Sequence, residues 1–250
     1  YLDAHDGKPA RLHALGSEPF VLCSPHAPLG TGATARRGSM HSSSEHDTIR
    51  FATELLDLVD HASTTTSYKY ALLLALIELA QENVGHADGP RGSVTTRQVA
   101  ERVVELYWRQ CAPYAPVGGV LEQMTRSGGS IPGSISEARA KAGQHGSSPT
   151  RLRLADPVAY TDLLDTVEWT LIRYPIPLLQ YVGRKQLSLL YDPAGWPTNP
   201  PSGPVRAYQR ALRQGTPFEG RFDNRLLFLP DVEQRLALLA GLFRPLVQRE

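Results

Sequence analysis

One stretch of this sequence predicts a helix that is apolar on nearly every side. Between Tyr68 and Gln81 the apolar residues are Tyr70, Ala71, Leu72, Leu73, Leu74, Ala75, Leu76, Ile77 and Leu79. A helix without a polar face must be covered by other elements all around, so we expect this helix at the centre of the core. The run is well short of the ~20 residues that a bilayer-spanning helix needs, so no membrane span is expected.

Amphipathic patterns flank this central helix. From Asp47 onwards, apolar residues recur at three- and four-residue spacing and predict a surface helix. Thr95 and Gln98 match a capping box, which predicts a third helix that ends before Pro113. The residues expected on the outward face of this third helix are Arg97, Glu101, Arg102, Glu105 and Arg109.

The second half of the sequence predicts helices together with short strands. After a weak helix over 134–142 and a linker over 143–150, Asp156 and Pro157 match an N-cap followed by proline at the first helical position. Short segments rich in aromatic and aliphatic residues then predict strands. The predicted elements are a helix over 157–174, a β-hairpin formed by 178–182 and 187–191, a strand over 225–229 and an amphipathic helix over 232–246.

These patterns predict a mainly α protein. We expect a bundle-like helical N-terminal half and a smaller α+β part made of a β-hairpin, one strand and a C-terminal helix. The helical subdomain is expected over 47–145 and the α+β subdomain over 150–250. Residues 1–46 are interpreted either as a flexible arm or as a non-native upstream segment, because residues 1–39 show no sustained period and the first methionine is Met40.

Composition excludes several classes of protein. Lys and Arg number 26 against 25 Asp and Glu, so the net charge of +1 excludes a polybasic tail protein and an acidic disordered chain. The two cysteines, Cys23 and Cys111, are too few for a disulfide scaffold or a CxxC zinc site. No charged segment followed by an apolar run opens the sequence, so we expect a cytoplasmic protein.

No specific catalytic constellation is present in the sequence. Asp162, Asp165 and Glu168 lie three residues apart and could in principle ligate a metal. Three acids on the outer face of an amphipathic helix more often form a solvated surface, and that is our interpretation of them. Nucleotide-binding GxxxxGK[ST] and GxGxxG motifs are absent. We therefore predict no catalytic residue, no metal ligand and no cofactor in this chain.

Three stretches of the chain carry a family resemblance when they are taken in order. They are Tyr68–Leu79, then Val103–Tyr114 with Val120–Gln123 behind it, and then Ile176–Gln180, Leu189–Tyr191 and Leu226–Pro230. In this order they resemble the N-terminal region of bacterial HNH endonuclease domain-containing proteins, over about residues 47–250. In that family, such a helical region precedes a C-terminal nuclease module that hydrolyses DNA phosphodiester bonds. The resemblance therefore implies a role in restriction or defence.

The sequence departs from this family at the catalytic set. An HNH module needs a histidine general base, an orienting asparagine and a histidine that ligates a divalent metal, which stabilises the leaving 3′ oxygen. No histidine follows His145 and no cysteine follows Cys111. The resemblance thus implies that the divalent metal and the hydrolysis belong to a nuclease module absent from this chain, which leaves open whether the protein is an enzyme.

Basic residues at predicted turns and helix ends are the candidate DNA contacts. They are Arg151 and Arg153 beside the linker, Arg184 and Lys185 at the hairpin tip, and Arg109 near the end of the third helix. They favour a DNA-interacting specificity or scaffold region of an HNH-type endonuclease, although plain solvated turns would look the same.

The alternative function has no nucleic-acid role. It is a helical module that binds another protein or forms a homodimer with a second copy of the chain. The aromatic pair Tyr107–Trp108 is its expected contact region. A contiguous positive face would favour DNA binding, because phosphate contacts dominate nucleic-acid affinity. An exposed apolar patch with mixed charge would favour the protein-interaction module.

Overall fold

The protein is mainly helical, as the sequence predicts. The computed structural model describes residues 39–60, 68–86, 91–112, 130–196 and 224–247. None of the helices in these ranges is long and apolar enough to cross a membrane. The helices, with two short 3-10 turns, are α1 (Ser39–Asp60), α2 (Tyr68–Val84), α3 (Thr96–Gln110), α4 (Ile131–Ala142), η1 (Gly143–Ser147), α5 (Pro149–Ala155), α6 (Pro157–Arg173), α7 (Pro175–Leu178), η2 (Pro193–Gly195) and α9 (Val232–Val247).

Helix α2 lies at the centre of the core, which confirms the prediction made from its apolar residues on nearly every side. Leu73 and Leu76 are 1% and 0% exposed, and α2 packs mainly against α9 and α3. On α9 the buried residues recur at three- and four-residue spacing and form one face: Val232, Leu236, Ala240 and Phe243. The end of the chain therefore covers a helix near its beginning, and one hydrophobic cluster includes residues from both predicted subdomains.

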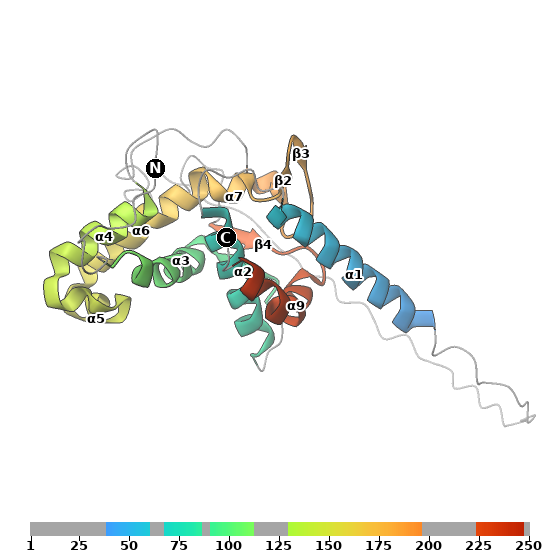
Figure 1. The fold of residues 1–250 in the computed structure, drawn as a ribbon, viewed down its shortest axis with the longest axis horizontal. Coiled ribbons are helices and arrows are strands. Elements are labelled where there is room, and N and C mark those ends of the chain that lie inside the picture. Colours follow the sequence, from blue (N-terminus) through green and yellow to red (C-terminus); the bar gives the residue numbers. More distant parts are fainter. Residues whose placement is uncertain (1–38, 61–67, 87–90, 113–129, 197–223, 248–250) are drawn as a thin grey trace, which may run out of the picture.

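Helix α6 is the second organising element. It packs against α3 and α4, and the short helix α5 lies at its N-terminal end (Figure 1). The predicted caps are present at both α3 and α6. Gln98 N donates to Thr95 Oγ1 at 3.1 Å and Thr95 N donates to Gln98 Oε1 at 2.9 Å, while Ala159 N donates to Asp156 Oδ1 at 2.9 Å.

The described strands form two small antiparallel pairs. Strands β2 (Tyr181–Val182) and β3 (Lys185–Gln186) make a hairpin at the predicted place. Strand β2 lies within the predicted first strand, but β3 precedes the predicted second strand over 187–191. Strand β4 (Arg225–Leu227) pairs with β1 (Ser93–Thr95), a strand that the sequence analysis does not predict. Because β1 and β4 come from opposite halves of the chain, their pairing ties the two predicted subdomains together.

Several boundaries differ from the prediction. Helix α1 begins at Ser39, ahead of the expected start at Asp47, and α4 begins at Ile131, ahead of Ser134, where Ser130 caps it. The segment 175–178 is helical, where a strand was expected to start. The predicted linker over 143–150 is ordered as η1 and the start of α5, because Ser148 caps α5 and Pro149 occupies its first turn.

Candidate nucleic-acid interface

The five predicted DNA contacts lie in three places. Arg151 and Arg153 are on α5, so they belong to a helix and do not flank a linker. Arg184 lies in the turn between β2 and β3, and Lys185 is the first residue of β3. Arg109 is in the last turn of α3. All five side chains are exposed.

The turn of the β2–β3 hairpin has a defined geometry. Val182 pairs with Lys185, so Gly183 and Arg184 make a two-residue connection, and Gly183 has a φ of 60°. Glycine adopts this left-handed conformation without the steric cost that a β-carbon brings. At the base of the hairpin, Leu187 N donates to the carbonyl oxygen of Gln180 at 2.8 Å. The hairpin therefore holds Arg184 and Lys185 at an ordered tip.

The five candidate side chains have no acidic partner in the described part of the chain, whereas several other arginines there pair with carboxylates. Within the described residues, no ion pair forms at Arg109, Arg153, Arg184 or Lys185, and Arg151 donates only to Ser147 Oγ, at 3.2 Å. The arginines that do pair with carboxylates are Arg50, Arg97, Arg102, Arg235 and Arg244. An exposed cation without an acidic neighbour keeps its field available to a phosphate.

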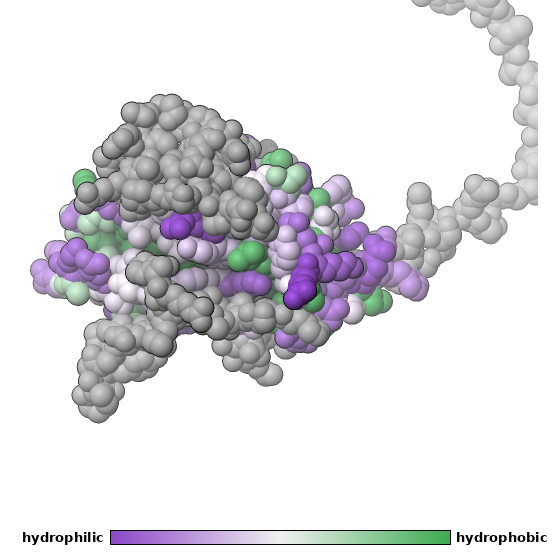
Figure 2. Space-filling view, turned by 90° about the horizontal axis from the view of Figure 1, so that it is seen from above, coloured by the Kyte–Doolittle hydropathy of each residue, from purple (hydrophilic) through white to green (hydrophobic). Residues whose placement is uncertain are grey.

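The structure does not bring the candidate residues into one cluster. The α5 pair and the hairpin pair lie near opposite ends of α6 (Figure 1). Helix α6 has 17 residues, which corresponds to about 25 Å at 1.5 Å per residue. On the face shown in Figure 2, hydrophilic and intermediate residues predominate and apolar residues form small separate spots. A nucleic acid that touched both pairs would have to run along α6.

The interpretation of Asp162, Asp165 and Glu168 as a solvated acidic surface was wrong for two of these three residues. Asp165 and Glu168 are only 5% and 1% exposed, whereas Asp162 is exposed. Arg97, which we expected to point outward from α3, pairs with both buried carboxylates, and its Nη2 lies 3.0 Å from Glu168 Oε2. The outward surface of α6 is therefore less acidic than the sequence indicates. No group of potential metal ligands occurs among the residues that the structure describes.

Thr96, the first residue of α3, contacts both the buried Glu168 of α6 and Asn224, the residue before β4. Thr96 Oγ1 donates to Glu168 Oε1 at 2.5 Å, and the backbone N of Thr96 donates to the carbonyl oxygen of Asn224 at 2.9 Å. Asn224 has a φ of 57°, a conformation that asparagine tolerates better than most residues. These contacts give Glu168 a structural role in fixing the junction of β1, α3 and α6.

The aromatic pair Tyr107–Trp108 lies in the core, so it does not form the surface of the alternative interaction module. The two residues are 3% and 2% exposed. The Tyr107 ring meets Tyr68 edge-on at 6.4 Å between centroids, and Trp108 Nε1 donates to the carbonyl oxygen of Gly146 at 3.1 Å. The Arg139 guanidinium lies 5.2 Å from the centroid of the Trp108 ring. Because contacts within the same chain bury both rings, neither is available to a partner or to a base.

Apolar side chains are exposed elsewhere on the surface. Leu238 and Leu242 are one turn apart on α9 and are 73% and 52% exposed. Among the described residues, the other large exposed apolar ones are Ile49, Leu154, Val158, Tyr174, Leu178 and Leu227. This α9 pair is the surface that a protein-interaction module could use in place of Tyr107–Trp108.

Beside the hairpin, an arginine contacts two aromatic rings, an arrangement that was not predicted from the sequence. At the end of α6 the Arg173 guanidinium lies 5.7 Å from the centroid of the Trp169 ring and 5.1 Å from that of Tyr174. Tyr174 is 43% exposed, and α7 leads from it into β2. The adjacent Arg173-Tyr174 before Pro175 is the sequence signal that could have indicated it. Exposed aromatic rings with cationic neighbours suit stacking on nucleobases.

Comparison with known proteins gives a match over part of the chain. Residues 48–131 match the model of a family described as a domain of unknown function (DUF8808). No curated protein and no solved structure matches the chain. This match shows no link to HNH endonucleases, so that resemblance stays a prediction. What the comparisons establish is that the segment from within α1 to the first residue of α4 is similar to the DUF8808 family.

Proposed function

We propose that this chain binds duplex DNA through its phosphate backbone, as a non-catalytic specificity or scaffold region of an HNH-type endonuclease. The observation that carries the proposal is the set of exposed basic side chains on α5 and at the β2–β3 tip that have no acidic partner among the described residues. Neutralisation of phosphates by such residues releases counterions and supplies most of non-specific DNA affinity.

The two basic pairs lie near opposite ends of α6 (Figure 1). The length of α6, about 25 Å, corresponds to about seven base pairs at 3.4 Å per step. Residues two apart on a helix do not face the same way, so one phosphate group cannot contact both Arg151 and Arg153. The tip residues Arg184 and Lys185 are adjacent in the hairpin and can meet neighbouring phosphates. We therefore expect a small number of phosphate contacts and weak binding with little sequence preference.

The nuclease assignment rests on the ordered resemblance between residues 68 and 230. Hydrolysis would come from a module that this chain does not contain, together with its divalent metal. With Mg²⁺ or Mn²⁺, this chain alone should leave duplex DNA uncut. Robust cleavage would contradict the non-catalytic assignment.

The test is the salt dependence of DNA binding. Fluorescence anisotropy with a labelled duplex should show affinity that falls steeply as salt rises. The double variant Arg184→Ala/Lys185→Ala should lower the slope of log affinity against log salt by about two, or one for each lost phosphate contact. The charge-matched control is Arg50→Ala/Lys141→Ala, which removes two cations that are paired with Asp47 and Glu137. The control should keep the wild-type slope.

Two results would overturn the proposal. One is the absence of binding at low salt, and the other is an equal loss of slope in both double variants, which would reflect net charge alone. In either case the second candidate moves ahead, namely a protein-interaction module that uses Leu238 and Leu242 of α9. Its signature would be a homodimer in light scattering that Leu238→Asp dissociates without unfolding the chain.

A further inference from the structure

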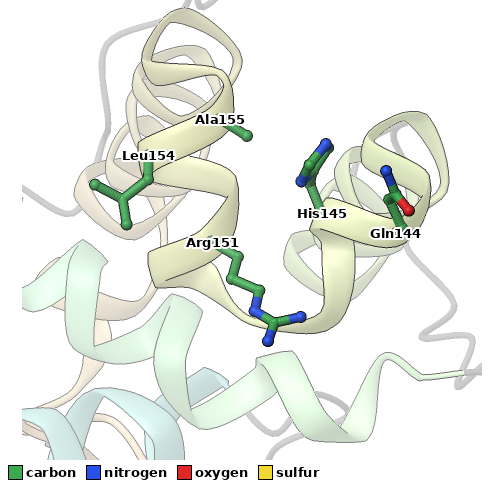
Figure 3. Close-up of a pocket in the computed structure, with 5 residues that line it drawn as sticks. All are labelled: Gln144, His145, Arg151, Leu154 and Ala155. Carbon is green, nitrogen blue, oxygen red and sulfur yellow. The ribbon is translucent and has the colours of Figure 1, made fainter.

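The space between η1 and α5 forms an open cleft of about 440 Å³. Its lining residues are Gln144, His145, Arg151, Leu154 and Ala155. The His145 ring and the Arg151 guanidinium enter this space from opposite sides (Figure 3). A volume of this size lies within the range of small-ligand pockets, about 300–1,000 Å³.

The side chains that line the cleft favour an anion. Arg151 supplies a guanidinium, His145 an imidazole and Gln144 an amide, and all three can donate hydrogen bonds. Among the residues that the structure describes, no acidic residue lines the cleft. A planar guanidinium with several parallel donors matches the geometry of a phosphate group.

Arg151 is held in place before any ligand arrives. Its Nη1 donates to Ser147 Oγ at 3.2 Å, and its backbone N donates to Ser148 Oγ at 3.1 Å. The remaining guanidinium donors have no acidic partner within the described chain. A side chain that is already oriented loses less conformational entropy when it binds a ligand.

The opposite wall of the cleft is anchored to the core. Gly146 of η1 is buried, and its carbonyl oxygen accepts the hydrogen bond from the buried Trp108. A β-carbon at Gly146 would lie 2.5 Å from the carbonyl oxygen of Arg139, so η1 packs directly on the backbone of α4. His145 and Gln144 therefore project from a fixed segment.

The α5 side of the cleft also contributes two apolar residues beside Arg151. Leu154 is 76% exposed and Ala155 is also exposed, so both have apolar surface that a ligand could cover. An apolar wall beside a set of donors suits a phosphate ester with an organic group attached, which would gain from burying that surface. Inorganic phosphate would use only the donors.

We propose that the cleft between η1 and α5 binds one phosphate of a nucleotide unit, with Arg151 as the main ligand and His145 and Gln144 as supporting donors. This inference rests on the proposed DNA-binding function, because it makes the cleft the place where a strand phosphate is held. The β2–β3 tip then adds electrostatic affinity at the other end of α6.

The experiment is a titration of the full ¹⁵N-labelled chain with thymidine 5′-monophosphate, followed by NMR. We expect saturable shifts at residues 144–155 and weaker binding of inorganic phosphate. Arg151→Gln should weaken nucleotide binding about tenfold or more, because a hydrogen bond to a charged group is lost. Arg91→Gln is the matched control, since Arg91 is exposed, does not line the cleft and is not one of the proposed DNA contacts. It should bind as wild type does, and thermal melts should show that both variants fold.

The outcomes separate this site from the wider function. Absence of saturable shifts, or equal weakening by Arg151→Gln and Arg91→Gln, overturns the cleft. Equal affinity for inorganic phosphate keeps a phosphate site and overturns the role of the apolar wall. If the cleft fails while Arg184→Ala/Lys185→Ala still changes the salt slope, the proposed DNA function stands without it. If the nucleotide binds and duplex DNA does not, the cleft stands and the DNA function falls.

Discussion

Arg97 of α3 reaches across to Glu168 of α6, with 3.0 Å between Nη2 and Oε2, and the same guanidinium pairs with Asp165. The side chains of Glu168 and Asp165 are 2% and 7% exposed, whereas that of Arg97 is 30% exposed. Two buried carboxylates thus share one arginine at the edge of the core. Buried charges are tolerated when they are paired and hydrogen-bonded, so this contact holds α3 in place on α6.

Removal of the Arg97 guanidinium should destabilise the fold. Arg97→Met leaves two buried carboxylates without their cation and should lower the free energy of unfolding by about 3–5 kcal/mol. Arg102→Met on the same helix is the control, because Arg102 pairs with the half-exposed Glu82 and Glu105. We expect the control to lose less than about 1 kcal/mol. Urea unfolding followed by circular dichroism measures both values, and similar losses would contradict the structural role of Arg97.

The buried amide of Gln180 should be equally hard to replace. Its Oε1 accepts from the backbone N of Leu189 at 2.9 Å and of Leu190 at 2.6 Å, and its Nε2 donates to the carbonyl oxygen of Tyr191 at 2.8 Å. Gln180→Leu strands these backbone groups, each at about 1–3 kcal/mol, so we expect a total loss of about 3 kcal/mol or more.

The matched control for Gln180 lies on the nearby hairpin. Gln186 is exposed on β3, and Gln186→Leu should change the free energy of unfolding by no more than about 0.5 kcal/mol. Chemical denaturation of the two variants decides the matter. A Gln180→Leu variant as stable as the Gln186→Leu variant would show that the amide does not support the 189–191 segment.

Two glycines should respond to alanine in opposite directions. A β-carbon at Gly146 would lie 2.5 Å from the Arg139 carbonyl oxygen, whereas one at Gly241 would meet nothing within 4 Å. Gly241 is inside α9, where alanine has the better helix propensity, so Gly241→Ala should stabilise by up to about 1 kcal/mol. Gly146→Ala should lower the melting temperature because η1 must move away from α4. A Gly146→Ala variant that melts no lower than wild type would contradict the close packing of η1.

Local sequence was sufficient to predict the helices whose ends carry their own signals. Thr95 with Gln98, and Asp156 with Pro157, define helix starts through contacts between residues three apart or fewer, and both starts are observed. The apolar circumference of α2 predicted its central place because no other environment suits such a helix. The exposure of Arg184 and Lys185 followed in the same way from the turn that contains Gly183.

Only the tertiary structure decided which side chains of the amphipathic helices meet one another. The period of α6 placed Asp165 and Glu168 on a polar face, but their burial depends on Arg97, which is far away in the sequence. Strand β1 is three residues long and exists through its pairing with β4, so no local period announces it. The cleft at Arg151 likewise needs η1 and α5 to fold back on each other. Local propensity and capping act within a few residues, whereas charge pairing, strand pairing and cavities arise from contacts that exist only once the chain is folded.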